Sequence, residues 1–425
     1  MKSGLLALYR YSVAKSTLFS CQKHAIACNY TENMLYYLYA NGKGCEKMSV
    51  KIKSGSLRKG WGRYDIMHLD RHVASIYEDG HCRVNYPSFL PFNLYLEQDD
   101  DLDARISNLD NFYYWCASRV LTLDRKYAKE IMNSIGASQA QTDKDRAQIA
   151  ISYHGLSLTD VYWIRAKNER ISFSDISLYR HSLSEAFADV SLRGRQLTAQ
   201  NAELLKPQDA AGDVGTSGVA PKAWVRRNGS FCLLKDGELR DVTAELLASR
   251  IVDQFSVSHV SYFPEEFEGV PVSCCKIITN EEISIVPFAH FEIRCANRGQ
   301  NAYRAIQKLD SYNYDMMNII DYLIGNTDRH WGNWGLLVNN KTNRPISLHP
   351  LMDFNKSFLA YDTEEGTQCQ TTEQKLSQRQ TAVDAVRRIG LNMVGKVEED
   401  WFPDEDMRKM FFTRLAILQK EDNKK

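Results

Sequence analysis

The stretch from Gly325 to Phe354 constrains the fold of this 425-residue chain more than any other. It reads GNTDRHWGNWGLLVNNKTNRPISLHPLMDF, in which a polar loop precedes two short apolar runs on either side of the turn-forming segment 339–343. This pattern predicts a hairpin with strands over 334–338 and 345–349. Because a hairpin returns the chain to the point where it left, the loop before it and the Asp-Phe pair after it should lie side by side.

Three oxygen-bearing side chains would then converge, namely Asp328, Asn333 and Asp353. Phosphoryl transfer needs a carboxylate that orients the attacking hydroxyl and oxygen ligands that hold magnesium on the phosphates. Hard oxygen donors suit Mg²⁺, which keeps coordination sites for water and phosphate. We therefore predict that Asp328 is the base and that Asn333 and Asp353 bind the metal. An Asp and an Asn five positions apart mean little alone, and a polar surface loop is the alternative.

Residues 222–235 predict a second hairpin, which presents a lysine. Two strand-like runs flank an Asn-Gly turn, and the second run ends at Lys235. A cation on a rigid strand can reach the α- and β-phosphates of a nucleotide, and Glu245, in a helix predicted over 244–255, would orient that cation. Without the downstream catalytic segment, Lys235 would be interpreted as an exposed lysine at a sheet edge.

The remaining nucleotide contacts are predicted at two places. Glycine and serine become frequent after residue 205, where backbone N–H groups of a flexible loop can approach phosphates. The candidates in this loop are Gly215, Ser217 and Gly218. Val286 and Phe288 would lie in the connector to a second lobe, where adenine meets backbone groups. His330 is a further candidate, either for phosphate contact or for loop architecture.

Hydrophobic periodicity and turn signals predict the other elements. Strands are expected over 68–77, 81–86, 257–263, 271–279 and 283–288, the last three completing a five-stranded sheet with the strands of 222–235. A pair of helices is expected in the region 111–135, and further helices are expected over 142–153, 302–309, 312–324, 373–389 and 404–419. The helix at 142 should open with a capping box formed by Thr142 and Asp145.

Composition narrows the class of protein. The formal charge is zero, so no global field directs the chain to nucleic acid or membrane. Its ten cysteines show no Cys-x-x-Cys metal pattern, and no apolar run has membrane-spanning length, which makes a reducing cytoplasm the expected compartment. Residues 1–65 differ, with eleven Lys and Arg against three acidic residues. They are either a nucleic-acid-binding arm or a poorly ordered extension.

The catalytic segment resembles that of the bacterial HipA-like serine/threonine kinases. The resemblance covers roughly residues 155–420 and is sharpest over 321–358. The Asp-Arg-His order at 328–330 and the segment 349–354 are also similar to phosphatidylinositol 3-/4-kinases. The chain departs from eukaryotic protein kinases, because Asn355 follows Asp-Phe in place of a Gly and no Ala-Pro-Glu comes later.

This resemblance implies an α+β, two-lobed protein-kinase-like fold, with a small β-rich nucleotide lobe and a larger, mainly helical lobe. An amino-terminal α+β docking domain would precede both lobes. The implied boundaries are 1–65 for the basic extension, 66–204 for the docking domain, 205–288 for the small lobe and 289–425 for the large lobe.

The resemblance also implies a function, namely transfer of phosphate from ATP with Mg²⁺ to Ser or Thr of a protein substrate. Thr216 or Ser217 would be a self-phosphorylation site, and an antitoxin-like or DNA-binding partner follows from the family alone. Two alternatives stay open at this point. One is a small-molecule or lipid kinase, and the other is a non-catalytic pseudokinase that acts as a regulatory or DNA-associated binding module.

Overall fold

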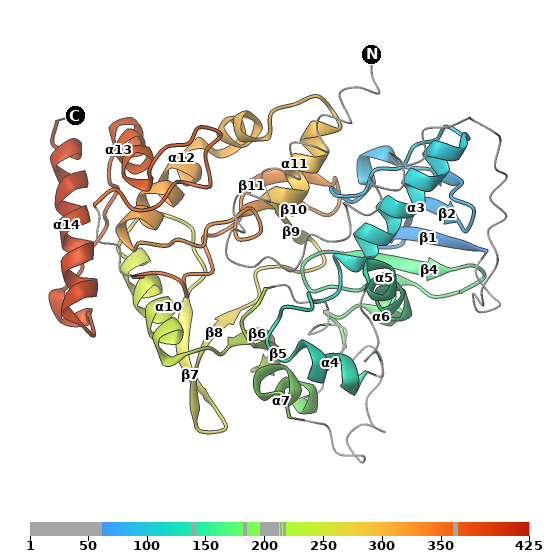
Figure 1. Ribbon diagram of the computed structural model, residues 1–425, viewed down its shortest axis with the longest axis horizontal. Helices are drawn as coiled ribbons and strands as arrows, with labels where there is room; N and C mark the ends of the chain where they lie inside the picture. The colour runs from blue at the N-terminus through green and yellow to red at the C-terminus, as the bar shows by residue number, and fades with distance from the viewer. Residues whose placement is uncertain are drawn as a thin grey trace, which may run out of the picture. The chain divides into compact units, whose positions relative to one another are not determined.

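The structure is a computed structural model. It describes residues 62–135, 137, 142–181, 185–195, 212, 215, 218–359 and 364–424. The chain divides into two units, Met1–Arg58 and Lys59–Lys425, and all the described residues belong to the second unit. The predictions for most of the basic segment 1–65, and for Thr216 and Ser217, therefore lie outside the described residues. Mixed helices and antiparallel sheets make up the second unit (Figure 1).

The first sheet is antiparallel and has the strand order β3-β2-β1-β4. Its strands are β1 (Arg63–His68), β2 (Arg71–Tyr77), β3 (Cys82–Val84) and β4 (Tyr162–Ala166). The strands predicted over 68–77 and 81–86, which the turn at 78–80 should join as a hairpin, correspond to β2 and β3, and these two strands pair, whereas β1 was not predicted as a separate strand. The reason is Asp65, a buried carboxylate that interrupts the apolar pattern and is neutralised by ion pairs with Arg63 and Arg165.

Helices pack against this sheet or connect it to the next. They are η1 (Pro87–Phe89), α3 (Leu102–Ala117), α4 (Ala128–Ser134), α5 (Asp143–Ser152), α6 (Phe173–Ile176) and α7 (Glu185–Arg193). The predicted capping box is confirmed at α5, where the Thr142 side chain accepts from the Asp145 N–H and Asp145 accepts from the Thr142 N–H. Trp115 and Trp163 are fully buried in this core.

The second sheet has the order β5-β6-β8-β7 and is antiparallel. It consists of β5 (Lys222–Arg227), β6 (Ser230–Lys235), β7 (Tyr262–Phe267) and β8 (Val270–Lys276). The predicted β5–β6 hairpin is confirmed, with Asn228 and Gly229 at φ 51° and 80°, as a tight hairpin turn requires.

The helix that carries Glu245 packs on this sheet and starts earlier than predicted. It is α10 (Leu239–Val252), so the predicted bounds of 244–255, with Thr243 as the residue that opens the helix, are wrong. The Thr243 hydroxyl donates instead to the carbonyl of Leu239, at 2.8 Å. A threonine can make this bond inside a helix as well as at its start, so its presence does not define the boundary.

A third sheet, with the order β11-β10-β9, corrects the predicted five-stranded sheet. Its strands are β9 (Ile283–Pro287), β10 (Gly335–Asn339) and β11 (Arg344–Leu348). The predicted β10–β11 hairpin is confirmed, but β9 pairs with β10 and not with the second sheet. Gly335 allows this pairing, because a Cβ at that position would collide with the carbonyl oxygen of Val286.

The remaining helices form the largest buried core together with the third sheet. They are α11 (Phe288–Ala296), α12 (Ala302–Leu323), α13 (Gln378–Ile389), η2 (Glu399–Trp401) and α14 (Glu405–Asp422). A kink at Asp310 divides α12, which matches the two helices predicted there. Helices α12, α13 and α14 pack against one another (Figure 1). In the described part of the chain, no helix has both the length and the apolar character needed to cross a bilayer.

Candidate active site

A buried lysine joins two carboxylates from distant parts of the sequence. Lys235, the last residue of β6, forms ion pairs with Glu245 on α10 and with Asp353 after β11. The Lys235 Nζ to Asp353 Oδ1 distance is 2.6 Å, and the Ser273 hydroxyl donates to the second oxygen of Glu245. The structure thus brings together three of the residues predicted for the site.

Electrostatics keep Asp353 and Lys235 ionised. Burial favours the neutral form of the Asp353 carboxyl, but Lys235 and Lys222 outweigh that effect and hold its pKa well below the usual range. Burial likewise opposes the charge on Lys235, but Asp353 and Glu245 raise its pKa well above the usual value. Each charge is therefore stabilised by its neighbours, as a buried charge requires.

Arg329 fixes the loop that precedes β10. Its Nε and Nη2 donate to the two carboxylate oxygens of Asp321 on α12, each at 2.9 Å. Its Nη1 donates to the backbone carbonyls of Asn333 at 2.7 Å and Met352 at 2.6 Å. One buried guanidinium therefore ties the loop to the residue before Asp353. The hydrogen bonds of Arg329 therefore serve the architecture of the loop.

Asp328 and Asn333 face each other within this loop. The Asn333 amide nitrogen donates to the Asp328 backbone carbonyl at 2.8 Å and lies 3.4 Å from the Asp328 Oδ2 atom. The Asp328 N–H donates to the Asn326 side chain at 3.1 Å. Burial raises the pKa of Asp328, His330 opposes this increase and Asp353 adds to it. The Asp328 and Asp353 carboxylates therefore repel each other electrostatically.

The side-chain oxygen atoms of Asn333 and Asp353 suit Mg²⁺. Asn333 uses its amide nitrogen for both hydrogen bonds and leaves its Oδ1 without a donor among the described residues. Asp353 is ionised, and its N–H donates to the Tyr262 hydroxyl at 3.1 Å. The residues that the structure describes include no group of three His, Cys, Asp or Glu side chains fit for a metal ion. An amide and one carboxylate would leave the other Mg²⁺ positions to phosphate and water.

A cavity of about 260 Å³ lies beside β9. Val286, Gly215 and Met352 line it, together with residues of the segments 115–119 and 157–162. Phe288 does not line it. Its ring stacks on Trp334, with centroids 4.2 Å apart, and its N–H donates to the Trp334 carbonyl.

The other predicted nucleotide contacts lie as follows. His330 is exposed, and its Nδ1 accepts from the Gly332 N–H at 3.0 Å. Gly218 has φ 97°, and a Cβ there would collide with the Nζ of Lys222. The loop backbone at Gly218 therefore lies directly against a lysine, whereas Ser217 lies outside the described residues.

Lys222 was not predicted as a site residue, although it lies opposite Lys235 in the β5–β6 register. It is buried, and the burial lowers its pKa to about 8, an effect that Asp353 opposes and Lys235 reinforces. The signal that could have revealed it is the hairpin itself. Once the Asn-Gly turn fixes the register, the first residue of one strand must pair with the last residue of the other.

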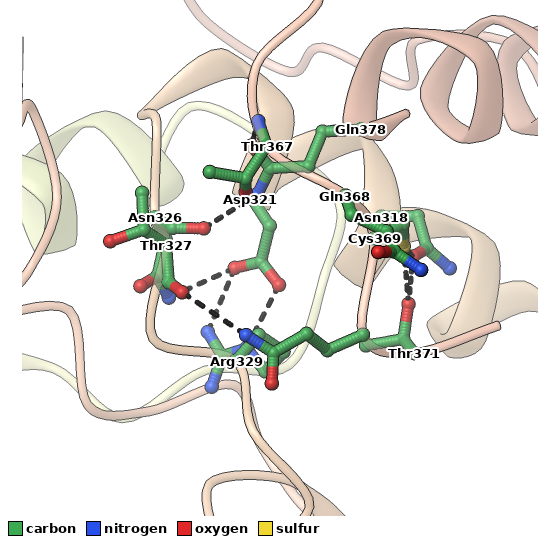
Figure 2. Close-up of a pocket in the computed structure, with 11 residues that line it drawn as sticks. Asn318, Asp321, Asn326, Thr327, Arg329, Thr367, Gln368, Cys369, Thr371 and Gln378 are labelled. Atoms are coloured by element: carbon green, nitrogen blue, oxygen red, sulfur yellow. Dashed lines mark hydrogen bonds and ion pairs between the residues drawn. The ribbon is translucent and has the colours of Figure 1, made fainter. Parts of the chain in front are cut away.

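A small polar cavity lies behind the loop (Figure 2). Its volume of about 10 Å³ is close to the space for one water molecule. Figure 2 shows the Asp321 carboxylate between the side chains of Asn326 and Arg329. Gln378, on α13, donates to the Asn326 carbonyl at 2.6 Å, and Gln370 donates to the Thr327 carbonyl at 3.5 Å. Gln370 and Gln378, which follow Asp353 in the sequence, therefore stabilise the loop before β10 through hydrogen bonds to its backbone.

Comparisons with known proteins found two similar solved structures. The chain is similar to a chain of the Shewanella oneidensis MR-1 toxin–antitoxin complex of HipA, HipB and operator DNA, with a TM-score of 0.50 and 12% identity, over 85% of this chain and 97% of that one. It is also similar to the Helicobacter pylori proinflammatory kinase CtkA, with a TM-score of 0.39 and 16% identity, over 48% of this chain and 91% of that one. No protein-family model and no curated protein matches the chain. The HipA-like resemblance predicted from the sequence is thus confirmed at the level of the fold.

Proposed function

We propose that this chain is a kinase that uses ATP and Mg²⁺ to phosphorylate Ser or Thr of a protein. The observation that carries the proposal is the Lys235 cluster, in which one lysine meets a helix-borne Glu245 and the Asp353 carboxylate. Kinases hold nucleotide phosphates and their magnesium with this set of groups. The HipA-like fold supports the same reading.

The two-lobed arrangement belongs to this proposal. The second sheet with α10 would be the small lobe, over 205–288, and residues 289–425 would be the large lobe. The first sheet and its helices would be the docking domain, predicted over 66–204, although β1 already begins at Arg63. The cavity beside β9 would take the adenine, with Val286 at its wall, and Lys222 and Lys235 would hold the phosphates from the paired ends of β5 and β6.

Each catalytic side chain would have one task. Lys235 would orient the phosphates while Glu245 orients Lys235, and Asp328 would accept the proton of the attacking hydroxyl. Burial raises the pKa of Asp328, which makes its carboxylate a stronger base. Asn333 and Asp353 would hold the magnesium, which neutralises charge that develops on the phosphates. Arg329 would keep Asn333 and Asp353 in register through their neighbouring carbonyls.

Substrate and partner are extensions of the proposal. Phosphorylation of a protein Ser or Thr, self-phosphorylation at Thr216 or Ser217, and pairing with an antitoxin-like or DNA-binding protein follow from the HipA-like resemblance. The similar chain from Shewanella oneidensis comes from a complex with HipB and DNA. A cytoplasmic location is supported by the seven cysteines of the described residues, which are all free thiols.

The test is transfer of labelled phosphate from ATP in the presence of Mg²⁺. The native chain is compared with Asp328→Asn and Asp353→Asn, and with the exposed Asp406→Asn as a matched control. We expect the first two variants to lose about a hundredfold to ten-thousandfold in rate, because each removes a charge used in the reaction, and the control to keep its rate. Full activity in both site variants would contradict the proposal. Nucleotide binding without transfer by the native chain would favour the pseudokinase.

A further inference from the structure

A second cavity, of about 370 Å³, lies between the end of α11, the β10–β11 turn and the chain around Ser88. Arginine is the most frequent side chain in its lining, with Arg294, Arg298 and Arg344. Phe92 and Asn343 line both this cavity and the one beside β9, so the two cavities are neighbours. The Lys235 cluster lines neither of them.

The charge of these arginines is not balanced by the protein. No carboxylate lines the cavity, and none of the three arginines forms an ion pair with any residue that the structure describes. By contrast, most other partly or fully buried arginines of the described chain, such as Arg119 and Arg329, are paired with carboxylates. Clustered cations without counter-charges repel one another, so the cluster carries a cost that a bound anion would remove.

Arg294 shows this imbalance most clearly. Its guanidinium lies over the Phe92 ring, 4.0 Å from the centroid, and its Nη1 is buried without a hydrogen-bond partner. Burial and, to a smaller extent, Arg298 lower the pKa of Arg294 to about 10, and no carboxylate acts in the opposite direction. A buried donor that lacks a partner is unusual in a native protein and costs free energy.

The helix dipole explains only part of the cluster. Arg294 lies in the last turn of α11 and Arg298 follows the helix, where positive charge is favoured. Arg344 has no such reason, since it is the first residue of β11 and comes from a different part of the chain. A hydrogen bond of the preceding residue holds Arg344 at this cavity, because the Asn343 amide donates to the Ser88 carbonyl at 2.9 Å.

We infer that this cavity binds a small ligand through a phosphoryl group, held by Arg294, Arg298 and Arg344. Guanidinium groups match the oxygen geometry of phosphate and form paired, charge-assisted hydrogen bonds with it. The hydroxyl of Ser88 and the amide of Gln300 add neutral hydrogen-bonding groups to the lining. The volume falls in the range of small-molecule sites. This inference does not rest on the proposed kinase activity.

The test is calorimetric titration of the full chain with inorganic pyrophosphate in the absence of nucleotide. The variant Arg298→Gln/Arg344→Gln removes two exposed charges, and Arg83→Gln, at an exposed position of β3, is the matched control. We expect the double variant to bind at least about tenfold more weakly and the control to bind like the native chain. Arg294→Gln should also bind more weakly, with unchanged melting temperatures in the two exposed variants as the check on folding.

Equal binding by the native chain and the double variant would overturn the inference, because the anion would then occupy another site such as the Lys235 cluster. Absence of any binding to the native chain would overturn it as well. A parallel titration with O-phospho-L-serine separates two sources of a phosphoryl group, a small phosphorylated metabolite and a phosphorylated serine. Tighter binding of pyrophosphate supports a small phosphorylated metabolite, and tighter binding of phosphoserine alone overturns that choice of source.

Discussion

The Lys235 cluster and the cavity lined by Arg294, Arg298 and Arg344 both contain cationic side chains, but they differ in whether the protein balances that charge. Lys235 is buried between two carboxylates, and each ion is stabilised by the others. In the cavity, Arg294, Arg298 and Arg344 gather with no acidic residue in the lining. In the first arrangement, opposite charges of the protein stabilise one another without a ligand, whereas the second leaves positive charge for a ligand to neutralise.

This difference predicts that substitutions in the Lys235 cluster lower the free energy of unfolding, whereas substitutions of the cavity arginines weaken only ligand binding. Removing one partner from a buried ion pair leaves an uncompensated charge, which is expensive. Removing a cation that has no partner takes away a cost. The same contrast exists inside the β5–β6 hairpin, where Lys235 is paired with acids and the opposite residue, Lys222, forms no ion pair with a described residue.

The largest effect is expected for Lys235→Met. This change leaves the buried Glu245 carboxylate with only the Ser273 hydroxyl, so the free energy of unfolding should fall by about 3–5 kcal/mol. Denaturation in urea measures it. Lys222→Met is the matched control, and it should be neutral or slightly stabilising because no carboxylate loses its partner. Equal losses in the two variants would break the comparison.

A smaller loss is expected for Asp321→Asn. The change keeps the shape of the side chain but removes the charge that balances Arg329, so the unfolding free energy should fall by about 3 kcal/mol. Asp400→Asn, at an exposed position, should have no measurable effect. Transfer activity should fall together with stability, since Arg329 holds the carbonyls of Asn333 and Met352. Native-like stability of Asp321→Asn would show that the ion pair between Asp321 and Arg329 does not stabilise the fold.

The smallest effect is a pH dependence that arises from Lys222. Burial lowers its pKa from 10.5 to about 8, so its ammonium is present at pH 7 and is lost as the pH rises through 8. ATP affinity should therefore fall by up to about tenfold between pH 7 and 9.5, and it should stay flat in Lys222→Arg, whose charge persists. Binding titrations across this range measure it, and identical profiles would exclude Lys222 from phosphate binding.

The same shift has a defined sign for folding. Because the pKa is lower in the folded chain, burying the charged lysine costs stability at every pH below about 8. That cost is relieved as the pH rises from 8 toward the unfolded value of 10.5. For this group, the unfolding free energy therefore rises with pH over that window.

Local signals predicted much of this fold. The Asn-Gly turn predicted the β5–β6 hairpin, Thr142 and Asp145 predicted the start of α5, and the break near residue 310 matches the kink in α12. These features depend on residues a few positions apart, so the sequence contains the whole interaction. The convergence of Lys235, Glu245 and Asp353 was inferred by combining two such hairpins with a family resemblance.

Long-range choices were harder to predict. Strand β9 could have joined either of two sheets, and the choice depends on the close approach that Gly335 allows. The arginine cavity combines residues about fifty positions apart, and the hydrogen bond from Asn343 to Ser88 fixes the turn across a separation of 255 residues. No periodicity in the sequence reports a contact of that kind.

Asp353 has φ 63°, on the left-handed side of the backbone map. Only glycine, asparagine and aspartate adopt this backbone handedness at low cost, so the position tolerates few residue types whatever its chemistry. A saturation library at 353 would therefore divide into three classes. Asparagine and glycine would give folded chains without the negative charge. Aspartate alone would give chains that both fold and keep the carboxylate proposed to bind Mg²⁺. β-Branched residues would strain the backbone at this position.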